Sequence, residues 1–63
     1  MKASEVKKGM IATTPNGEMT FNVVKVENIT NPKGIEITVE RNKFDITQWF
    51  KSDAQVFDGW IIE

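Results

Sequence analysis

Cysteine, histidine and tyrosine are absent from this chain of 63 residues, and proline occurs only twice. Without cysteine the chain has no disulfide, no thiol redox chemistry and no zinc-finger site. A nucleophile–histidine–carboxylate triad is likewise excluded. No apolar run reaches the length of a signal-peptide core or of a transmembrane helix. Together with the lack of cysteine, this predicts a cytoplasmic protein.

The short length leaves room for one domain, residues 1–63. A domain of this size buries only about 60% of the surface that its unfolded chain exposes, so its stability is expected to be marginal. Since disulfides are excluded, the two Trp and four Phe must fill the core together with Ile and Val. A homo-oligomer is the remaining route to extra stability.

Basic and acidic residues nearly balance, with eight Lys and Arg against nine Asp and Glu and a net charge of −1. Dedicated DNA-binding domains usually carry a clear basic excess, because phosphate neutralisation drives their affinity. The balance therefore argues against strong non-specific nucleic-acid binding, and it leaves a local basic patch open.

Nothing in the chain predicts an enzyme or a cofactor. Glu36 and Glu40 form a carboxylate pair on an outward strand face, and Ser4 and Ser52 have only surface lysines as neighbours in this interpretation. Acid–base catalysis needs a pocket that perturbs pKa values, which a chain this small rarely encloses. No stretch matches an EF-hand loop or a glycine-rich phosphate cradle, so no metal or cofactor site is expected.

The clearest pattern is the alternation of apolar and polar residues from 35 to 47 (IEITVERNKFDIT). This period of two predicts a β-hairpin with one apolar and one polar face. A two-residue loop at Arg41–Asn42 is expected to place Glu40 opposite Lys43, so that the polar face is charge-matched.

The rest of the chain predicts short strands, turns and one helical turn. Phe21 and Val23 alternate out of phase with Val24 and Val26, which predicts a bent strand or a β-bulge. The expected elements are a helical turn or an extended lead-in at 1–9, strands at 10–14, 19–27 and 60–62, a turn at 15–18 and a loop at 28–34. At 48–55 we expect a helical turn, with an extended continuation of the sheet as the alternative. The expected fold is all-β: a five-stranded SH3-like barrel with one short helical turn before the last strand.

Three segments carry a resemblance to a known family: Ala3–Met10 (ASEVKKGM), Val23–Val26 (VVKV) and Asn31–Gly34 (NPKG). They resemble the opening strands and the loop of the first domain of bacterial elongation factor P, an SH3-like barrel. The resemblance implies that Lys33 matches that family's functional loop lysine and implies a translational role. The family's loop has a further glycine. The single-domain format also resembles small phage or mobile-element accessory proteins.

Aromatic residues are the leading candidates for a binding site. Trp49 and Phe50 are adjacent, so whether the segment is a strand or a helix, their side chains cannot both point fully into the protein core. Core filling is one interpretation of the large aromatics, and an exposed anchor for a partner is the other. Our first hypothesis is a non-enzymatic interaction module that binds a protein partner through Trp49, Phe50, Trp60 and Phe21.

Two alternatives remain open. A nucleic-acid-binding barrel would use a lysine patch, although acidic residues interleave these lysines and equally indicate a solvated mixed-charge surface. The lysines of that patch are Lys7, Lys8, Lys25 and Lys33, with Lys43 at the hairpin tip. A self-assembling subunit would instead use an outward Phe21–Val23 pair or an open sheet edge.

Overall fold

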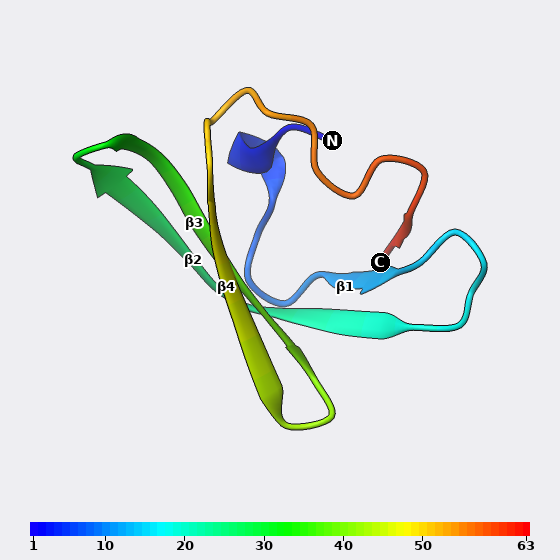
Figure 1. Ribbon diagram of the computed structural model, residues 1–63. Helices are drawn as coiled ribbons and strands as arrows, with labels where there is room; N and C mark the ends of the chain where they lie inside the picture. The colour runs from blue at the N-terminus through cyan, green and yellow to red at the C-terminus, as the bar shows by residue number, and fades with distance from the viewer.

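Five antiparallel strands form one sheet in the computed structural model, which describes residues 1–63 (Figure 1). The strands are β1 (Ile11–Thr13), β2 (Thr20–Thr30), β3 (Lys33–Arg41), β4 (Phe44–Phe50) and β5 (Ile61–Ile62), preceded by a 3-10 turn, η1 (Ala3–Glu5). Their order in the sheet is β4-β3-β2-β1-β5. The all-β fold with five strands is confirmed, and of the two forms expected for residues 1–9 the structure has the helical turn.

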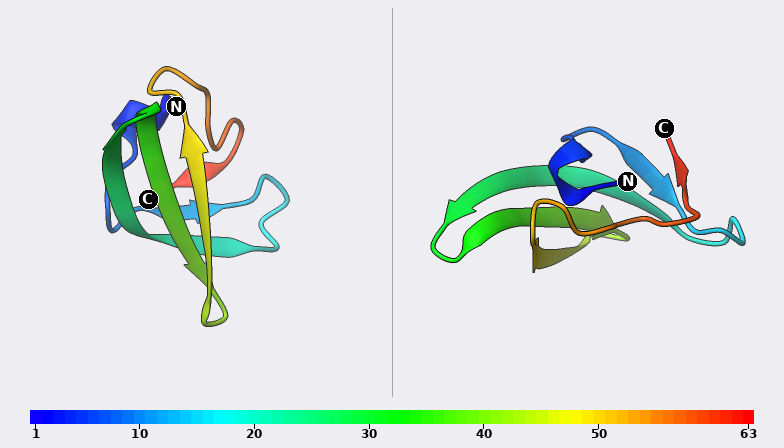
Figure 2. Two further views of the ribbon diagram at one scale, coloured as in Figure 1. Left: turned by 60° about the vertical axis from the view of Figure 1, so that its left-hand side comes forward. Right: turned by 90° about the horizontal axis from the view of Figure 1, so that it is seen from above.

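The long strand β2 serves both halves of the sheet. Its first residues pair with β1, and the remainder pairs with β3. The register shifts between Val23, which pairs with Val39, and Lys25, which pairs with Thr38. Val24 is therefore the extra residue of a β-bulge, as its phase in the sequence predicts, and the sheet curves at this point (Figures 1 and 2). Because β4 and β5 are edges, the sheet is not closed and a barrel is not confirmed.

The β3–β4 hairpin turns one residue later than expected. Arg41 pairs with Phe44, so the loop is Asn42–Lys43, not Arg41–Asn42. Both loop residues have positive φ, 52° and 67°. Such a turn matches the twist of the strands, and Asn tolerates positive φ better than Arg does. The prediction that Glu40 faces Lys43 is consequently wrong, since Glu40 lies opposite Asp45.

The predicted loop at 28–34 is in fact a second hairpin. Thr30 pairs with Lys33, which leaves a two-residue turn at Asn31–Pro32 with a cis peptide bond. Turns of this class carry a cis proline at their third position. Gly34, which we expected in the loop, lies inside β3.

The helical turn predicted at 48–55 does not form. Gln48 to Phe50 belong to β4, and the chain then runs irregularly to β5. Its backbone groups pair with the N-terminal segment instead: Ala3 N–H donates to Ala54 O at 2.9 Å, and Val56 N–H donates to Met1 O at 2.8 Å. Figures 1 and 2 show the two segments side by side. These long-range hydrogen bonds replace the local ones that a helix would need.

The core lies on one face of the sheet, under the N-terminal segment and the chain that follows β4. Its buried members are Ala3, Val6, Val23, Ile35, Ile37 and Val56. Toward the tip of the β3–β4 hairpin the cover ends, and there Phe44 is 75% exposed and Ile46 is 54% exposed. The outward Phe21–Val23 pair proposed for self-assembly is therefore wrong for Val23, which is only 2% exposed. No helix in the structure is of a length and apolarity that would span a membrane.

Candidate functional site

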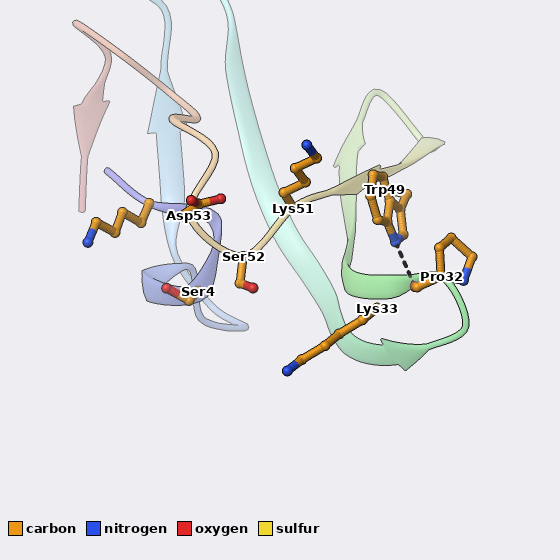
Figure 3. A pocket seen from close by; sticks show the side chains of 8 residues that line it. Ser4, Pro32, Lys33, Trp49, Lys51, Ser52 and Asp53 are labelled. Atoms are coloured by element: carbon orange, nitrogen blue, oxygen red, sulfur yellow. Dashed lines mark hydrogen bonds between the residues drawn. The ribbon is translucent and has the colours of Figure 1, made fainter.

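A groove of about 550 Å³ opens beside the β2–β3 turn (Figure 3). Its walls come from the N-terminal segment, the β2–β3 turn, the end of β4 and the chain that follows β4. The residues that line it are Lys2, Ser4, Pro32, Lys33, Trp49, Lys51, Ser52 and Asp53. We call this surface the Trp49 groove.

Trp49 forms the aromatic wall of the groove and is held there by two contacts. Its indole Nε1–H donates a hydrogen bond of 3.2 Å to the carbonyl of Pro32, drawn as a dashed line in Figure 3. The ring also lies against Gly34, where a Cβ would fall 2.5 Å from Cε2. The side chain nevertheless remains 37% exposed. A lone glycine inside a strand signals such a close approach, and that signal was in the sequence.

The opposite wall is fixed by backbone pairing. Ser4 N–H donates to the carbonyl of Ser52 at 3.0 Å, so the N-terminal segment and the chain after β4 form one continuous surface. A second hollow of about 340 Å³ adjoins the groove and shares Ser4, Lys33 and Ser52 with it. The two hollows together extend along the β2–β3 hairpin, which makes the site elongated.

The electrostatics of the groove are cationic. Three lysines line it, Lys2, Lys33 and Lys51, against a single carboxylate, Asp53. None of them is in an ion pair, because the one salt bridge in the structure joins Lys25 to Glu27 at 3.1 Å. In Figure 3 the ammonium groups of Lys33 and Lys51 point in opposite directions. The lysines therefore suit negative charges spaced along a ligand better than a single compact anion.

The aromatic residues predicted as a site fall on two different faces. Phe21 and Trp60 lie together with their ring centroids 5.7 Å apart, and Phe57 lies 5.2 Å from Trp60. Phe50 is half-buried and packs against the core. Adjacent strand residues point to opposite faces, so Trp49 alone among the predicted aromatics reaches the groove.

The predicted lysine patch is likewise divided. Lys33 lies in the groove, whereas Lys25 is paired with Glu27 on the polar face of the sheet. Lys7 and Lys8 lie exposed in the chain before β1 and do not line the groove. Lys2 and Lys51 were missed, since only the pairing of the N-terminal segment with the chain after β4 brings them to Lys33.

The serines of the groove form no hydrogen-bonded pair with its lysines, and the structure holds no cluster of metal-ligating side chains. No Ser4 or Ser52 hydroxyl is hydrogen-bonded to a lysine. No three carboxylates of the chain approach one another as metal ligands would. What the groove offers to a ligand is an indole face, three ammonium groups, two hydroxyls and one carboxylate.

No protein-family model, no curated protein and no solved structure matches this chain. Function is therefore inferred from the geometry of the Trp49 groove.

Proposed function

We propose that this protein is a non-enzymatic interaction module that binds a protein partner in the Trp49 groove. The ligand is an extended segment of that partner, with an apolar side chain for Trp49 and acidic side chains for the lysines. One observation carries the proposal: three lysines without ion-pair partners flank a partly exposed indole in one groove.

The physical chemistry of interfaces supports this assignment. Tryptophan is enriched among the residues that dominate binding energy, particularly where it is rigidly held. Trp49 meets this condition, because Gly34 and the Pro32 carbonyl fix its ring. Exposed lysines around such an anchor contribute orientation and association rate more than affinity. An elongated groove with a fixed indole and mobile charges matches an extended peptide.

Nucleic acid is the second candidate ligand. It is favoured because Trp49 and Lys33 line the same groove, and surfaces that bind single-stranded nucleic acid combine aromatic rings with basic side chains. Negative charge beside the groove weighs against it. Glu36 lies directly opposite Trp49, and Glu27 lies opposite Glu36 on the same polar face. A phosphate backbone carries a charge at every nucleotide and would meet this acidic face on leaving the groove, whereas a peptide can confine its acidic side chains to the groove. The chain as a whole also carries a net charge of −1.

The bent strand β2 is a feature that this sheet shares with small β-barrels of the SH3-like kind. A bent strand that serves both halves of a sheet is the device by which small barrels turn a corner, and β2 has that form. This supports the SH3-like assignment. The resemblance to the first domain of elongation factor P, in which Lys33 is the matching position, stays a prediction.

Selection from a displayed library of random short peptides tests the proposed function. We expect the wild-type protein to enrich sequences that combine acidic residues with an apolar or aromatic residue. Reversing two groove charges, in Lys2→Glu/Lys33→Glu, should weaken a selected peptide about tenfold. The control Lys8→Glu changes a lysine outside the groove and should leave binding unchanged.

Two results would count against the proposal. One is a set of enriched peptides whose binding survives both the double reversal and Trp49→Ala. The other is tight binding of a single-stranded RNA or DNA oligonucleotide with affinity that falls steeply as salt rises, which would favour the nucleic-acid alternative.

A further inference from the structure

The outer edge of β4 is free along its whole length. β4 is one end of the sheet, and its seven residues pair with β3 alone. The opposite edge, β5, has only two residues. Soluble proteins usually protect a long edge with proline, a bulge or a lysine in the middle of the strand. β4 contains no proline and no lysine, and its register with β3 is uninterrupted.

The hairpin geometry defines which groups this edge presents. Arg41 and Phe44 flank a two-residue turn, and such flanking residues form a hydrogen-bonded pair. Alternate residues of β4 therefore direct their N–H and C=O groups away from β3, toward the free edge. These are Asp45, Thr47 and Trp49. Lys51 follows just beyond the strand, where its carbonyl accepts the Ala54 N–H at 3.0 Å, so Lys51 offers its side chain and not its carbonyl to the edge.

We propose that this edge pairs with the same edge of a second copy, antiparallel about a twofold axis at Gln48. The two sheets would then continue into one another through β4. Such an interface is isologous, so every contact occurs twice. In this register each Asp45 lies opposite the partner's Lys51, and each Trp49 lies opposite the partner's Thr47. The hydrogen-bonding groups of the free edge then face one another.

Charge and hydrophobicity select this register over its neighbours. Moving the twofold axis to Thr47 places Lys43 opposite the partner's Lys51, and moving it to Trp49 places Asp45 opposite the partner's Asp53. Like charges directly opposite one another destabilise a strand pair. With the axis at Gln48 two charged pairs result, Asp45 with the partner's Lys51 and Lys43 with the partner's Asp53, and both are of opposite sign.

The apolar face of β4 gains cover from the same arrangement. Ile46, which is 54% exposed, comes to lie opposite the partner's Phe50. Ile46, Gln48 and Phe50 already line a shallow apolar hollow of about 100 Å³, together with residues of β3 and Phe57. The twofold axis at Gln48 joins the two hollows into one. Self-association thus covers surface that the small core leaves exposed.

The dimer and the proposed ligand share Trp49 and Lys51 and differ in the other residues that they need. The dimer engages Lys51, whereas Lys2, Lys33 and the Pro32 side of Trp49 remain in the groove. A failure of peptide binding would leave the dimer in place, and a monomeric protein would leave the groove in place.

A charge-swap series tests the dimer with the full-length protein. Sedimentation over a range of protein concentrations should show a change from 7.2 kDa to twice that mass. Asp45→Lys and Lys51→Asp should each raise the dissociation constant at least about tenfold, because each places like charges opposite one another twice. Combining the two substitutions should restore dimerisation. The control Glu18→Lys changes an exposed charge in the turn before β2 and should have no effect.

Backbone amide exchange provides a second measurement that needs no variant. We expect protection of the Thr47 and Trp49 amides to rise with protein concentration. A constant 7.2 kDa mass at every concentration would overturn the proposal. The proposal would also be overturned if the Asp45→Lys/Lys51→Asp double variant folded but stayed monomeric. Protection of the Thr47 and Trp49 amides that rises only when a peptide is added would overturn it as well, as would the formation of large particles without a dimer.

Discussion

The indole of Trp49 lies so close to Gly34 that a Cβ on residue 34 would fall 2.5 Å from the ring and 2.6 Å from the carbonyl oxygen of Phe50. This contact joins β4 to β3 and places the aromatic wall of the groove. We expect Gly34→Ala to lower the free energy of unfolding by about 1–3 kcal/mol, as overpacking does, and to loosen Trp49. Urea unfolding measures the loss.

The double variant Gly34→Ala/Trp49→Ala separates the two clashes. Removing the ring relieves the side-chain contact, but the Phe50 carbonyl remains. The cost of the alanine should therefore be smaller in the Trp49→Ala background without vanishing. An alanine at position 34 that leaves stability unchanged in the wild-type background would contradict the close packing.

The β3–β4 turn holds a lysine at positive φ. Lys43 has a φ of 67° and follows Asn42 in a two-residue hairpin loop. Asn-Gly is the most favoured pair for such a loop, so Lys43→Gly should raise the free energy of unfolding by about 0.5–1 kcal/mol. Lys43→Ala removes the same charge but keeps the Cβ, and it should bring no gain. Equal stability of the glycine and alanine variants would argue against this turn.

Glu40 and Asp45 lie directly opposite one another on neighbouring strands. Like charges in such a position destabilise a sheet, so Glu40→Lys should stabilise the protein by about 0.2–1 kcal/mol at low salt. The gain should shrink as salt rises. Glu18→Lys makes the same change in net charge at an exposed turn position. If both variants gain equally, net charge and not the strand pair is responsible.

Burial separates two apolar residues that resemble one another in the sequence pattern. Val23 is 2% exposed in the core, and Phe44 is 75% exposed at the hairpin tip. Val23→Ala should cost about 2 kcal/mol through lost burial and a cavity. Phe44→Ala should change the unfolding free energy by less than about 0.5 kcal/mol, as surface substitutions do. Thermal and urea unfolding of both variants at dilute protein concentration check this order.

Local patterns in the sequence were sufficient to predict the elements whose form depends on residues close together in the chain. Alternation identified the β3–β4 hairpin, and the phase change near Val24 identified the bulge in β2. The turn position was wrong by one residue, because alternation sets the faces of a hairpin without setting its register. Since the expected and observed registers differ by two residues, each side chain keeps its predicted face.

Long-range pairing explains what the sequence did not predict. Residues 48–55 show a helical spacing of apolar side chains, yet the hydrogen bonds of Ala54 and Val56 with the N-terminal segment exclude a helix there. The same pairing brings Lys2 and Lys51 to Lys33. No local signal carries that information, so Trp49 was identified as a candidate while most of its groove was not.

The two tryptophans provide the most direct test of the proposed binding site. Trp49 lies in the groove, and Trp60 lies against Phe21 and Phe57. Their indole N–H resonances therefore report separately on the two regions in one NMR titration with an acidic peptide selected from the displayed library. We expect the Trp49 resonance to shift in a saturable manner and the Trp60 resonance to stay in place. A shift of Trp60 with Trp49 unmoved would place the ligand on the other surface and contradict the account.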